Sequence, residues 1–368
     1  MSVDFYKAYR LCVDKISEYH DNLPVRSMVL AGNPKLAAWK LEQLVKHENY
    51  GYNQLHLDAL TKDKLTEKYH TNSITKKAVS DANVTPLHFA CVNPNREVLA
   101  KLLEQSPEFN VQDTMLFKPI HFAAVCMDSA NLELLVEKGA NLFDVTNTKA
   151  SALHLAAQVG SAACVAAILK LNPRIARLRD RPGLSAMAYA LELGEIEPIK
   201  AFLDSGAVKV NQGQGKDRMT PLMYAASRGN YELCEFLLER KARVLSKDKF
   251  KRTPLIMAVR NGHVKVASLL LQYGSDWNHP DSSSNTPLHY AAGFGWKECV
   301  DLLIAHGANI NANNSWKVTP ITIAMMKNNI GIVYDLLKRK DIEVDGKDDK
   351  GRTILMLSMV DLTGNECL

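Results

Sequence analysis

The chain repeats a short pattern of apolar and polar positions at nearly constant intervals. The pattern starts at residues 85, 118, 151, 185, 220, 253, 286, 319 and 353, and successive starts lie 33 to 35 residues apart. Its clearest copies read TPLHFA, TPLMYA, TPLIMA and TPLHYA. A period of this length, kept from residue 85 to residue 358, predicts a stack of similar units and not two unrelated globular domains.

Each unit predicts two helices followed by a polar loop. The first threonine is a good N-cap, and the proline after it suits the first helical position. Glycines nine residues after the start predict the end of the first helix, at Gly160, Gly194, Gly229, Gly262 and Gly295. Glycines 21 residues after the start predict the end of the second, at Gly139, Gly206, Gly274 and Gly307. Alanine pairs such as Ala156-Ala157 and Ala225-Ala226 let neighbouring helices approach closely.

The period and the T-P-L-H-x-A string resemble the ankyrin repeat family. The resemblance implies an all-α ankyrin-repeat solenoid with short β-hairpin finger loops along one edge. It also implies that the histidine at the fourth motif position has a structural role and bonds to backbone and threonine between repeats. These histidines are His88, His121, His154 and His289. A shared zinc ion is excluded because repeats lie about 10 Å apart, whereas a zinc–nitrogen bond is about 2 Å.

The two ends depart from the repeat. We expect residues 1–50 to form an N-terminal helical cap, with an apolar face in residues 4–20 and a second helix capped by Asn33 and Pro34. Residues 51–84 predict a degenerate repeat that keeps Leu55-His56-Leu57, and residues 85–352 predict eight repeats. Residues 353–368 predict an incomplete ninth repeat. We expect it to continue in a longer protein, the alternative being a natural terminus covered by a partner or by its own tail.

One stretch could be mistaken for a membrane span. Residues 151–169 carry no formal charge and approach transmembrane length. We interpret them as two short packed helices interrupted at Gly160 and Ser161, and we expect no membrane insertion.

Composition and cysteine usage indicate a folded protein of a reducing compartment. Hydrophobic residues make up 46% and charged residues 23%, which excludes disorder as the main state. The seven cysteines contain no C-x-x-C pair, and no apolar segment marks a secretory signal at the N-terminus. We therefore expect a cytoplasmic or nuclear location.

No pattern of catalytic residues stands out. The chain contains no phosphate-binding loop, no dinucleotide-binding glycine motif and no metalloprotease or serine hydrolase signature. The segment Gly213-Gln214-Gly215-Lys216 predicts a flexible finger and not a phosphate cradle. We expect no catalytic residue, no metal and no cofactor, and we expect the chain not to be an enzyme.

Positive charge concentrates in three successive finger loops. The net charge is +5, yet residues 170–265 contain 19 Lys and Arg against 10 Asp and Glu. The basic loop residues are Arg177, Arg179, Arg181, Lys216, Arg218, Lys247, Lys249, Lys251 and Arg252. Stacking would align them in a basic stripe that attracts an acidic partner, unless the loops are charged only for solubility.

Aromatic residues stand where the motif favours polar groups. Phe250 and Trp316 each lie three residues before a motif threonine, in predicted fingers. Phe294 and Trp296 flank Gly295 at the end of a first helix. Exposed aromatic residues are frequent anchors of interfaces, so we expect Phe250, Phe294 and Trp316 to contact a partner.

The family resemblance implies a scaffold or adaptor that recognises another protein through its fingers and concave helix face. We expect an acidic or acidic-aromatic partner segment and a monomeric array within a larger chain or complex. One alternative is the targeting module of a larger enzyme, because Ser73–Ala78 and Val84–Asn95 are similar to arrays of ankyrin-bearing poly(ADP-ribose) polymerases. Nucleic-acid binding is a disfavoured alternative, since basic and aromatic residues interleave only at Lys249-Phe250-Lys251.

Overall fold

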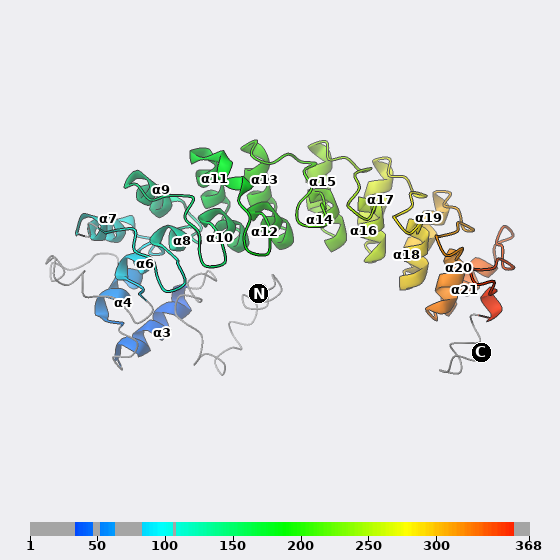
Figure 1. Cartoon of the computed structure of the whole chain (residues 1–368), viewed down its shortest axis with the longest axis horizontal. Helices are drawn as coiled ribbons and strands as arrows, with labels where there is room; N and C mark the ends of the chain where they lie inside the picture. Colours follow the sequence, from blue (N-terminus) through cyan, green and yellow to red (C-terminus); the bar gives the residue numbers. More distant parts are fainter. Residues whose placement is uncertain (1–33, 47–51, 63–82, 106–107, 357–368) are drawn as a thin grey trace. The chain divides into compact units, whose positions relative to one another are not determined.

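A computed structural model describes residues 34–46, 52–62, 83–105 and 108–356 (Figure 1). The chain divides into two compact units, residues 1–209 and residues 210–368, and each is described by itself. Four expectations lie wholly or partly outside the described residues: the helix over residues 4–20, the Asn33 cap, the degenerate repeat at its residues 63–82 (with Ser73–Ala78), and the incomplete ninth repeat at its residues 357–368.

The first unit is a row of helix pairs. After α3 (Pro34–Lys46), the first helices of the pairs are α4 (Gln54–Thr61), α6 (Pro86–Ala90), α8 (Pro119–Ala123), α10 (Ala152–Val159) and α12 (Ala186–Leu193). The second helices are α7 (Arg96–Gln105), α9 (Ala130–Glu137), α11 (Ala162–Leu171) and α13 (Ile196–Asp204), with a short 3₁₀ helix, η5 (Pro173–Arg177), after α11. First helices contact first helices of the next pair, and second helices contact second helices, so the unit has two layers (Figure 1).

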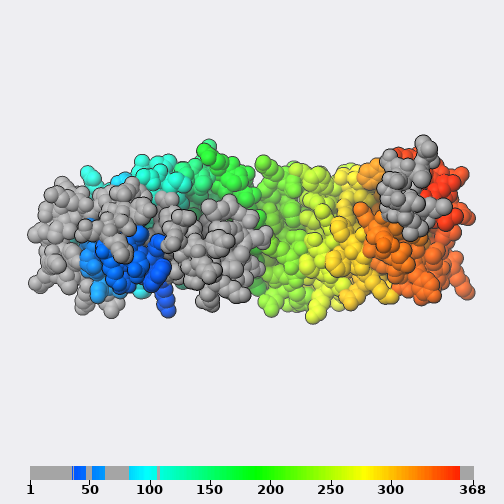
Figure 2. All heavy atoms as spheres, turned by 90° about the horizontal axis from the view of Figure 1, so that it is seen from below, coloured from blue at the N-terminus to red at the C-terminus, as the bar shows by residue number. Residues whose placement is uncertain are grey.

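The second unit repeats this arrangement. Its first helices are α14 (Pro221–Arg228), α16 (Pro254–Arg260), α18 (Pro287–Phe294) and α20 (Pro320–Met326). Its second helices are α15 (Tyr231–Glu239), α17 (Val264–Gln272), α19 (Lys297–Ala305) and α21 (Ile330–Leu337). Figure 2 shows the second unit as adjacent bands of surface in sequence order, as expected when each repeat contacts its neighbours. The all-α repeat fold expected from the sequence is confirmed.

The helix ends follow the predicted signals. Gly160 closes α10 with a left-handed φ of +81°, and Ser161 then caps α11 by accepting the Cys164 N–H. The uncharged stretch 151–169 is therefore two short helices, as predicted. Among the described residues, no helix is long and apolar enough to cross a membrane.

The core forms where the two layers meet. The alanine pairs of the first helices are buried, including Ala156-Ala157 and Ala225-Ala226 at 0 to 1% exposure. Large side chains such as Phe89 and Phe122 fill the first unit, and their rings pack edge to face at 6.3 Å. Small residues at some positions and large ones at others let the layers pack closely.

The finger loops are turns and not extended strands. In the described residues they form only isolated antiparallel bridges, which pair Val145 with Ser151, Gln214 with Met219, and Lys347 with Thr353. The residue two positions before each motif start has a left-handed φ. These residues are Asn83, Leu116, Lys149, Gly183, Arg218, Lys251, Ser284, Lys317 and Gly351. The tight turn that they share fixes the direction of every finger tip.

Candidate functional site: the finger loops

The motif histidines connect each repeat to the next. In the repeat that starts at Thr85, the Thr85 backbone N–H donates to His88 Nδ1 at 3.1 Å, and the Thr85 hydroxyl lies 2.9 Å from the same atom. His88 Nε2 donates to the carbonyl oxygen of Phe117, in the following finger, at 3.3 Å. An accepting Nδ1 and a donating Nε2 define the neutral imidazole. The structural role implied by the family resemblance is confirmed.

The same arrangement extends to the degenerate repeat before residue 85. Asn53 takes the place of the threonine, and its backbone N–H donates to His56 Nδ1 at 3.2 Å. His56 Nε2 donates to the carbonyl oxygen of Val84 at 3.0 Å. These contacts support the proposal that residues 51–84 are a repeat.

Burial keeps these imidazoles neutral. It lowers the pKa of His56, His88 and His121 to about 4, because the charged form would lose its hydration. Burial also lowers the pKa of His154 and His289. A second proton would add a donor at Nδ1, where a backbone N–H already points. Histidines bound in this way serve the fold and leave no ring nitrogen for a substrate.

An acidic or amide side chain shapes six of the described fingers, and this feature was missed in the sequence; the fingers before Ser151 and Thr220 have Thr146 and Gly215 at that position. Asp248 Oδ1 accepts from the backbone N–H groups of Phe250 at 2.9 Å and Arg252 at 2.8 Å. The equivalent side chain accepts from its own loop at Asp113, Asp180, Asp281, Asn314 and Asp348. The signal was available, since Asp or Asn stands five residues before each of these motif starts.

Successive fingers are joined by one backbone hydrogen bond each. Within the second unit, the Lys249 N–H donates to the Asp217 carbonyl oxygen at 3.0 Å, and the Ser282 N–H donates to the Phe250 carbonyl oxygen at 2.8 Å. The loops that carry Lys216 and Arg218 and Lys247 to Arg252 are thus brought side by side. The loop with Arg179 and Arg181 belongs to the first unit, and Arg177, which the sequence placed in that loop, is the last residue of η5.

The finger around Phe250 combines an aromatic ring with two cations. Lys249 Nζ lies 4.8 Å and Arg252 Cζ lies 4.7 Å from the centre of the Phe250 ring, which is 40% exposed. Lys249 pairs with Asp217 at 2.5 Å, and Arg252 pairs with Asp248 at 2.6 Å. Both cations are therefore neutralised locally, and they orient the ring more than they attract a distant partner.

The other basic residues of the predicted stripe are exposed and have no ion pair with any described residue. They are Arg177, Arg179 and Arg181 in the first unit, and Lys216, Arg218, Lys247 and Lys251 in the second. Within the second unit, the finger residues of the predicted set whose positive charge is not paired are therefore Lys216, Arg218, Lys247 and Lys251.

The remaining aromatic candidates lie in two different settings. Trp316 is 50% exposed in a finger, and its carbonyl oxygen accepts the Asp349 N–H at 3.0 Å. Phe294 is 53% exposed at the end of α18 and stacks on Tyr290 with ring centres 6.4 Å apart. Tyr290 is held in turn by its hydroxyl, which donates to Asp281 at 2.6 Å. The ring of Phe294 is therefore held by Tyr290, and the loop that carries Trp316 is held by the following finger.

Trp296 is mainly a packing residue. Its indole N–H donates to the Arg260 carbonyl oxygen at 3.1 Å. A Cβ atom added at Gly262 would lie 2.7 Å from the indole ring, so only glycine leaves room for it. The ring holds α19 against the end of α16.

No group of three or more His, Cys, Asp or Glu side chains with metal-binding geometry occurs among the residues that the structure describes. The described cysteines Cys91, Cys126, Cys164, Cys234 and Cys299 are free thiols. The predicted core cysteines Cys164, Cys234 and Cys299 are fully buried, and burial raises the pKa of each thiol to about 11 or 12.

Comparison with known proteins agrees with this geometry. The family described as Ankyrin repeats (3 copies) matches residues 87–178, 153–248 and 243–314, which together are more than half of the chain. The poly(ADP-ribose) polymerase tankyrase of Caenorhabditis elegans is 32% identical over 271 residues, which are 68% of this chain and 12% of tankyrase. The nuclear factor NF-kappa-B p105 subunit of Gallus gallus is 30% identical over 161 residues, 43% of this chain and 16% of p105.

A homologue of transient receptor potential cation channel subfamily A member 1 from Caenorhabditis elegans is 29% identical over 164 residues, 44% of this chain and 13% of that protein. The chain thus spans less than a fifth of each of these three relatives. What they share with it is the repeat array, a non-catalytic module that binds other proteins. The chain belongs to the ankyrin repeat family.

Proposed function

We propose that this chain is a protein-recognition module whose finger loops bind an acidic or acidic-aromatic segment of another protein. The finger of residues 247–252 carries the proposal: an exposed Phe250 ring is fixed by Lys249 and Arg252, and the unpaired lysines Lys247 and Lys251 stand beside it. A rigid ring next to free cations suits a partner that presents a carboxylate close to an aromatic or apolar side chain.

Phe294 and Trp316 extend the proposed surface within the second unit. Both are about half exposed; the Phe294 ring stacks on Tyr290, and the backbone of Trp316 is bonded to the following finger. A ring that is already ordered, such as that of Phe294, loses little conformational entropy when it binds, which favours its use as an anchor. We assign the array itself no catalytic role.

The experiment uses a random copolymer of glutamate and tyrosine as the probe. Lys247→Glu with Lys251→Glu should weaken its binding at least tenfold, because neither lysine is tied to an acidic side chain and reversal leaves the loop intact. Lys265→Glu, on an exposed position of α17, is the matched control and should leave affinity nearly unchanged. Binding should also fall as salt is raised. Equal loss in the control, or no loss in the double variant, would refute the proposal.

A second candidate function rests on the similarity to tankyrase. The array would be the targeting part of a larger enzyme whose catalytic domain follows it, and its partner would be that enzyme's substrate or anchor. Sequencing the full transcript tests this directly. A reading frame that continues into a folded catalytic domain supports it, and a stop codon after Leu368 refutes it.

We also propose a reducing compartment, the cytoplasm or the nucleus. The free thiols of the described residues support this location, since isolated cysteines are rare in oxidising compartments. Microscopy of a fluorescent fusion would test it, and secretion into the medium would contradict it.

A further inference from the structure

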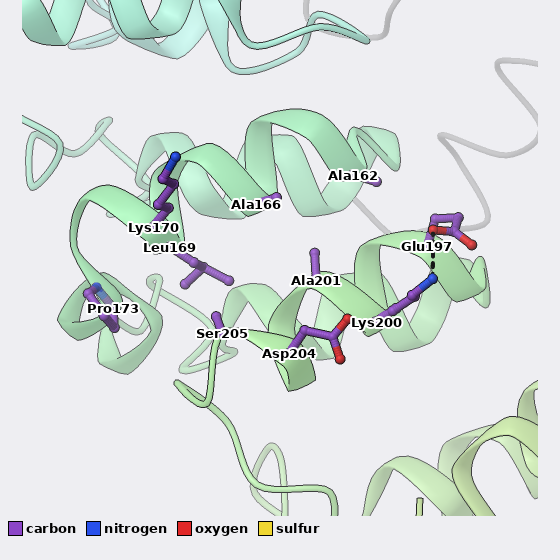
Figure 3. Close-up of a pocket in the computed structure, with 10 residues that line it drawn as sticks. All are labelled: Ala162, Ala166, Leu169, Lys170, Pro173, Glu197, Lys200, Ala201, Asp204 and Ser205. Atoms are coloured by element: carbon purple, nitrogen blue, oxygen red, sulfur yellow. Dashed lines mark ion pairs between the residues drawn. The ribbon is translucent and has the colours of Figure 1, made fainter. Parts of the chain in front are cut away.

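A groove lies between α11 and α13, in the second-helix layer of the first unit and apart from the finger loops. It is a shallow groove, open to solvent, with a volume of about 580 Å³. Its floor consists of Ala166, Leu169 and Ala201, and the view along it shows these side chains between the two helices (Figure 3). The floor is thus apolar, with two alanines beside one leucine.

The groove is open because α11 presents only methyl groups on its outward face. At the two outward positions of α11 stand Ala162 and Ala166, and the equivalent positions of α19 hold Lys297 and Asp301. Long side chains at those positions would reach across to the next helix. Methyl groups leave the space open and allow a partner's backbone to come close.

Charge distinguishes the two ends of the groove. At the end where η5 begins, Lys170, Arg174 and Arg177 are all exposed and have no ion pair with a described residue. At the other end, Glu197 and Lys200 form an ion pair at 4.0 Å. The lysine and Pro173 line the groove itself, and the two arginines follow within the next four residues. Asp204 also lines it, but its side chain points away from Lys170 (Figure 3).

We propose that this groove binds an amphipathic helix of another protein, with aliphatic side chains on the alanine floor and acidic residues against Lys170, Arg174 and Arg177. The groove runs between helices of 10 and 9 residues, which corresponds to about 14 Å or two to three helical turns. A helix of that length presents one apolar stripe and can place its acidic residues at one end, which matches the charge of the groove.

This surface is separate from the finger surface of the second unit, so the two proposals fail independently. Lys247→Glu with Lys251→Glu should leave groove binding unchanged. A protein that binds through both surfaces would recognise two chemically different segments.

The test uses two synthetic helices of about 16 residues with leucines at i, i+3, i+4 and i+7, one with glutamates in its first turn and the other with lysines there. Fluorescence anisotropy should show binding of the acidic helix and at least tenfold weaker binding of the basic one. Arg174→Glu with Arg177→Glu should reverse that preference. Equal binding of the two helices, or binding of neither, would overturn the proposal.

A substitution that fills the groove tests whether the acidic helix binds there. Ala166→Trp should abolish binding of the acidic helix, because the indole occupies the floor of the groove. Ser268→Trp, at the equivalent position of α17, is the matched control and should bind as the original chain does. Thermal unfolding checks that both variants fold. Unchanged binding by Ala166→Trp overturns the proposal, as does a probe-free dimer that this substitution dissociates, since the groove would then belong to a second copy of the chain.

Discussion

The two units connect neighbouring repeats with different residues at the fourth motif position. In the first unit this position holds a histidine in four of the five described repeats, at His56, His88, His121 and His154, and Ala188 in the fifth. In the second unit it holds Met223, Ile256, His289, Thr322 and Met356. The first unit therefore depends on neutral imidazoles that cross from one repeat to the next, whereas the second depends mainly on apolar packing.

The threonine before this position changes its role accordingly. Where histidine follows, the hydroxyl contacts the imidazole, as Thr85 does with His88. Where an aliphatic residue follows, the hydroxyl caps its helix, as Thr253 does by accepting the Ile256 N–H at 3.3 Å. One motif thus encodes two local structures, and the fourth residue decides which one forms.

Low pH should produce the largest difference in stability between the two units. An unfolded histidine has a pKa near 6.5, but in the folded first unit His56, His88 and His121 have a pKa of about 4. The unfolded state therefore binds more protons below about pH 6.5, and folding free energy is lost as the pH falls toward 4. At pH 5 the loss is roughly 2 kcal/mol for each histidine, about 6 kcal/mol for the three.

Hydrogen exchange followed by mass spectrometry at pH 7 and pH 5 measures this loss in each unit of the intact chain. Protection should fall more in residues 83–209 than in residues 210–356. Equal losses in both units would show that the histidines do not control acid stability. His88→Met, which copies Met223, should remove about a third of the loss in the first unit.

Truncation of one histidine should have the next largest effect. His88→Ala removes a fully buried side chain and leaves the Thr85 N–H and the Phe117 carbonyl oxygen without their partner. We expect a loss of about 3 kcal/mol in unfolding free energy, from the cavity and the unsatisfied groups together. Urea denaturation measures it. A loss below that of Thr253→Ala would contradict the role assigned to the histidine.

Loss of a helix cap should cost less, and it sharpens the comparison of the two threonine roles. Thr253→Ala removes the hydroxyl that accepts the Ile256 N–H, and it should destabilise the second unit by about 1 kcal/mol. Thr253→Ser keeps the hydroxyl and should recover most of that loss. If serine and alanine unfold at the same urea concentration, the cap contributes nothing.

The smallest effect is expected at an exposed ion pair. Lys249 and Asp217 lie in neighbouring fingers, with side chains 43% and 41% exposed. Lys249→Ala should change the unfolding free energy by less than about 0.5 kcal/mol, because water and salt screen the pair. A change above 1 kcal/mol in thermal or urea unfolding would show that the fingers stabilise the stack more than their exposure implies.

Local signals made much of the fold predictable from the sequence. Helix starts at threonine and proline and helix ends at glycine depend on neighbouring residues, and Gly160 and Ser161 divided the uncharged stretch as expected. The ion pairs at Lys249 and Arg252 could not be foreseen in the same way. The Lys249 pair depends on the register between two fingers, which the Lys249 N–H sets with Asp217.

The groove in the second-helix layer was missed for a related reason. Its volume depends on how side chains of two repeats fill a shared space, and α11 alone shows only that its outward residues are short. The charged end depends on η5, a 3₁₀ turn that replaces a direct link from the helix to its finger. The alanines Ala162 and Ala166 were visible in the sequence, but their effect on the space between α11 and α13 was not.

The left-handed residue of each finger has a consequence for engineering. Glycine would relieve about 1 kcal/mol at such a position, yet Lys149, Arg218, Lys251 and Lys317 keep long cationic side chains there. Replacing these four residues by glycine, one after another, should raise the melting temperature with each substitution. Each substitution also removes one positive charge from a finger tip. Melting temperature would then rise while affinity for an acidic ligand falls, because both depend on which residue occupies this one left-handed position.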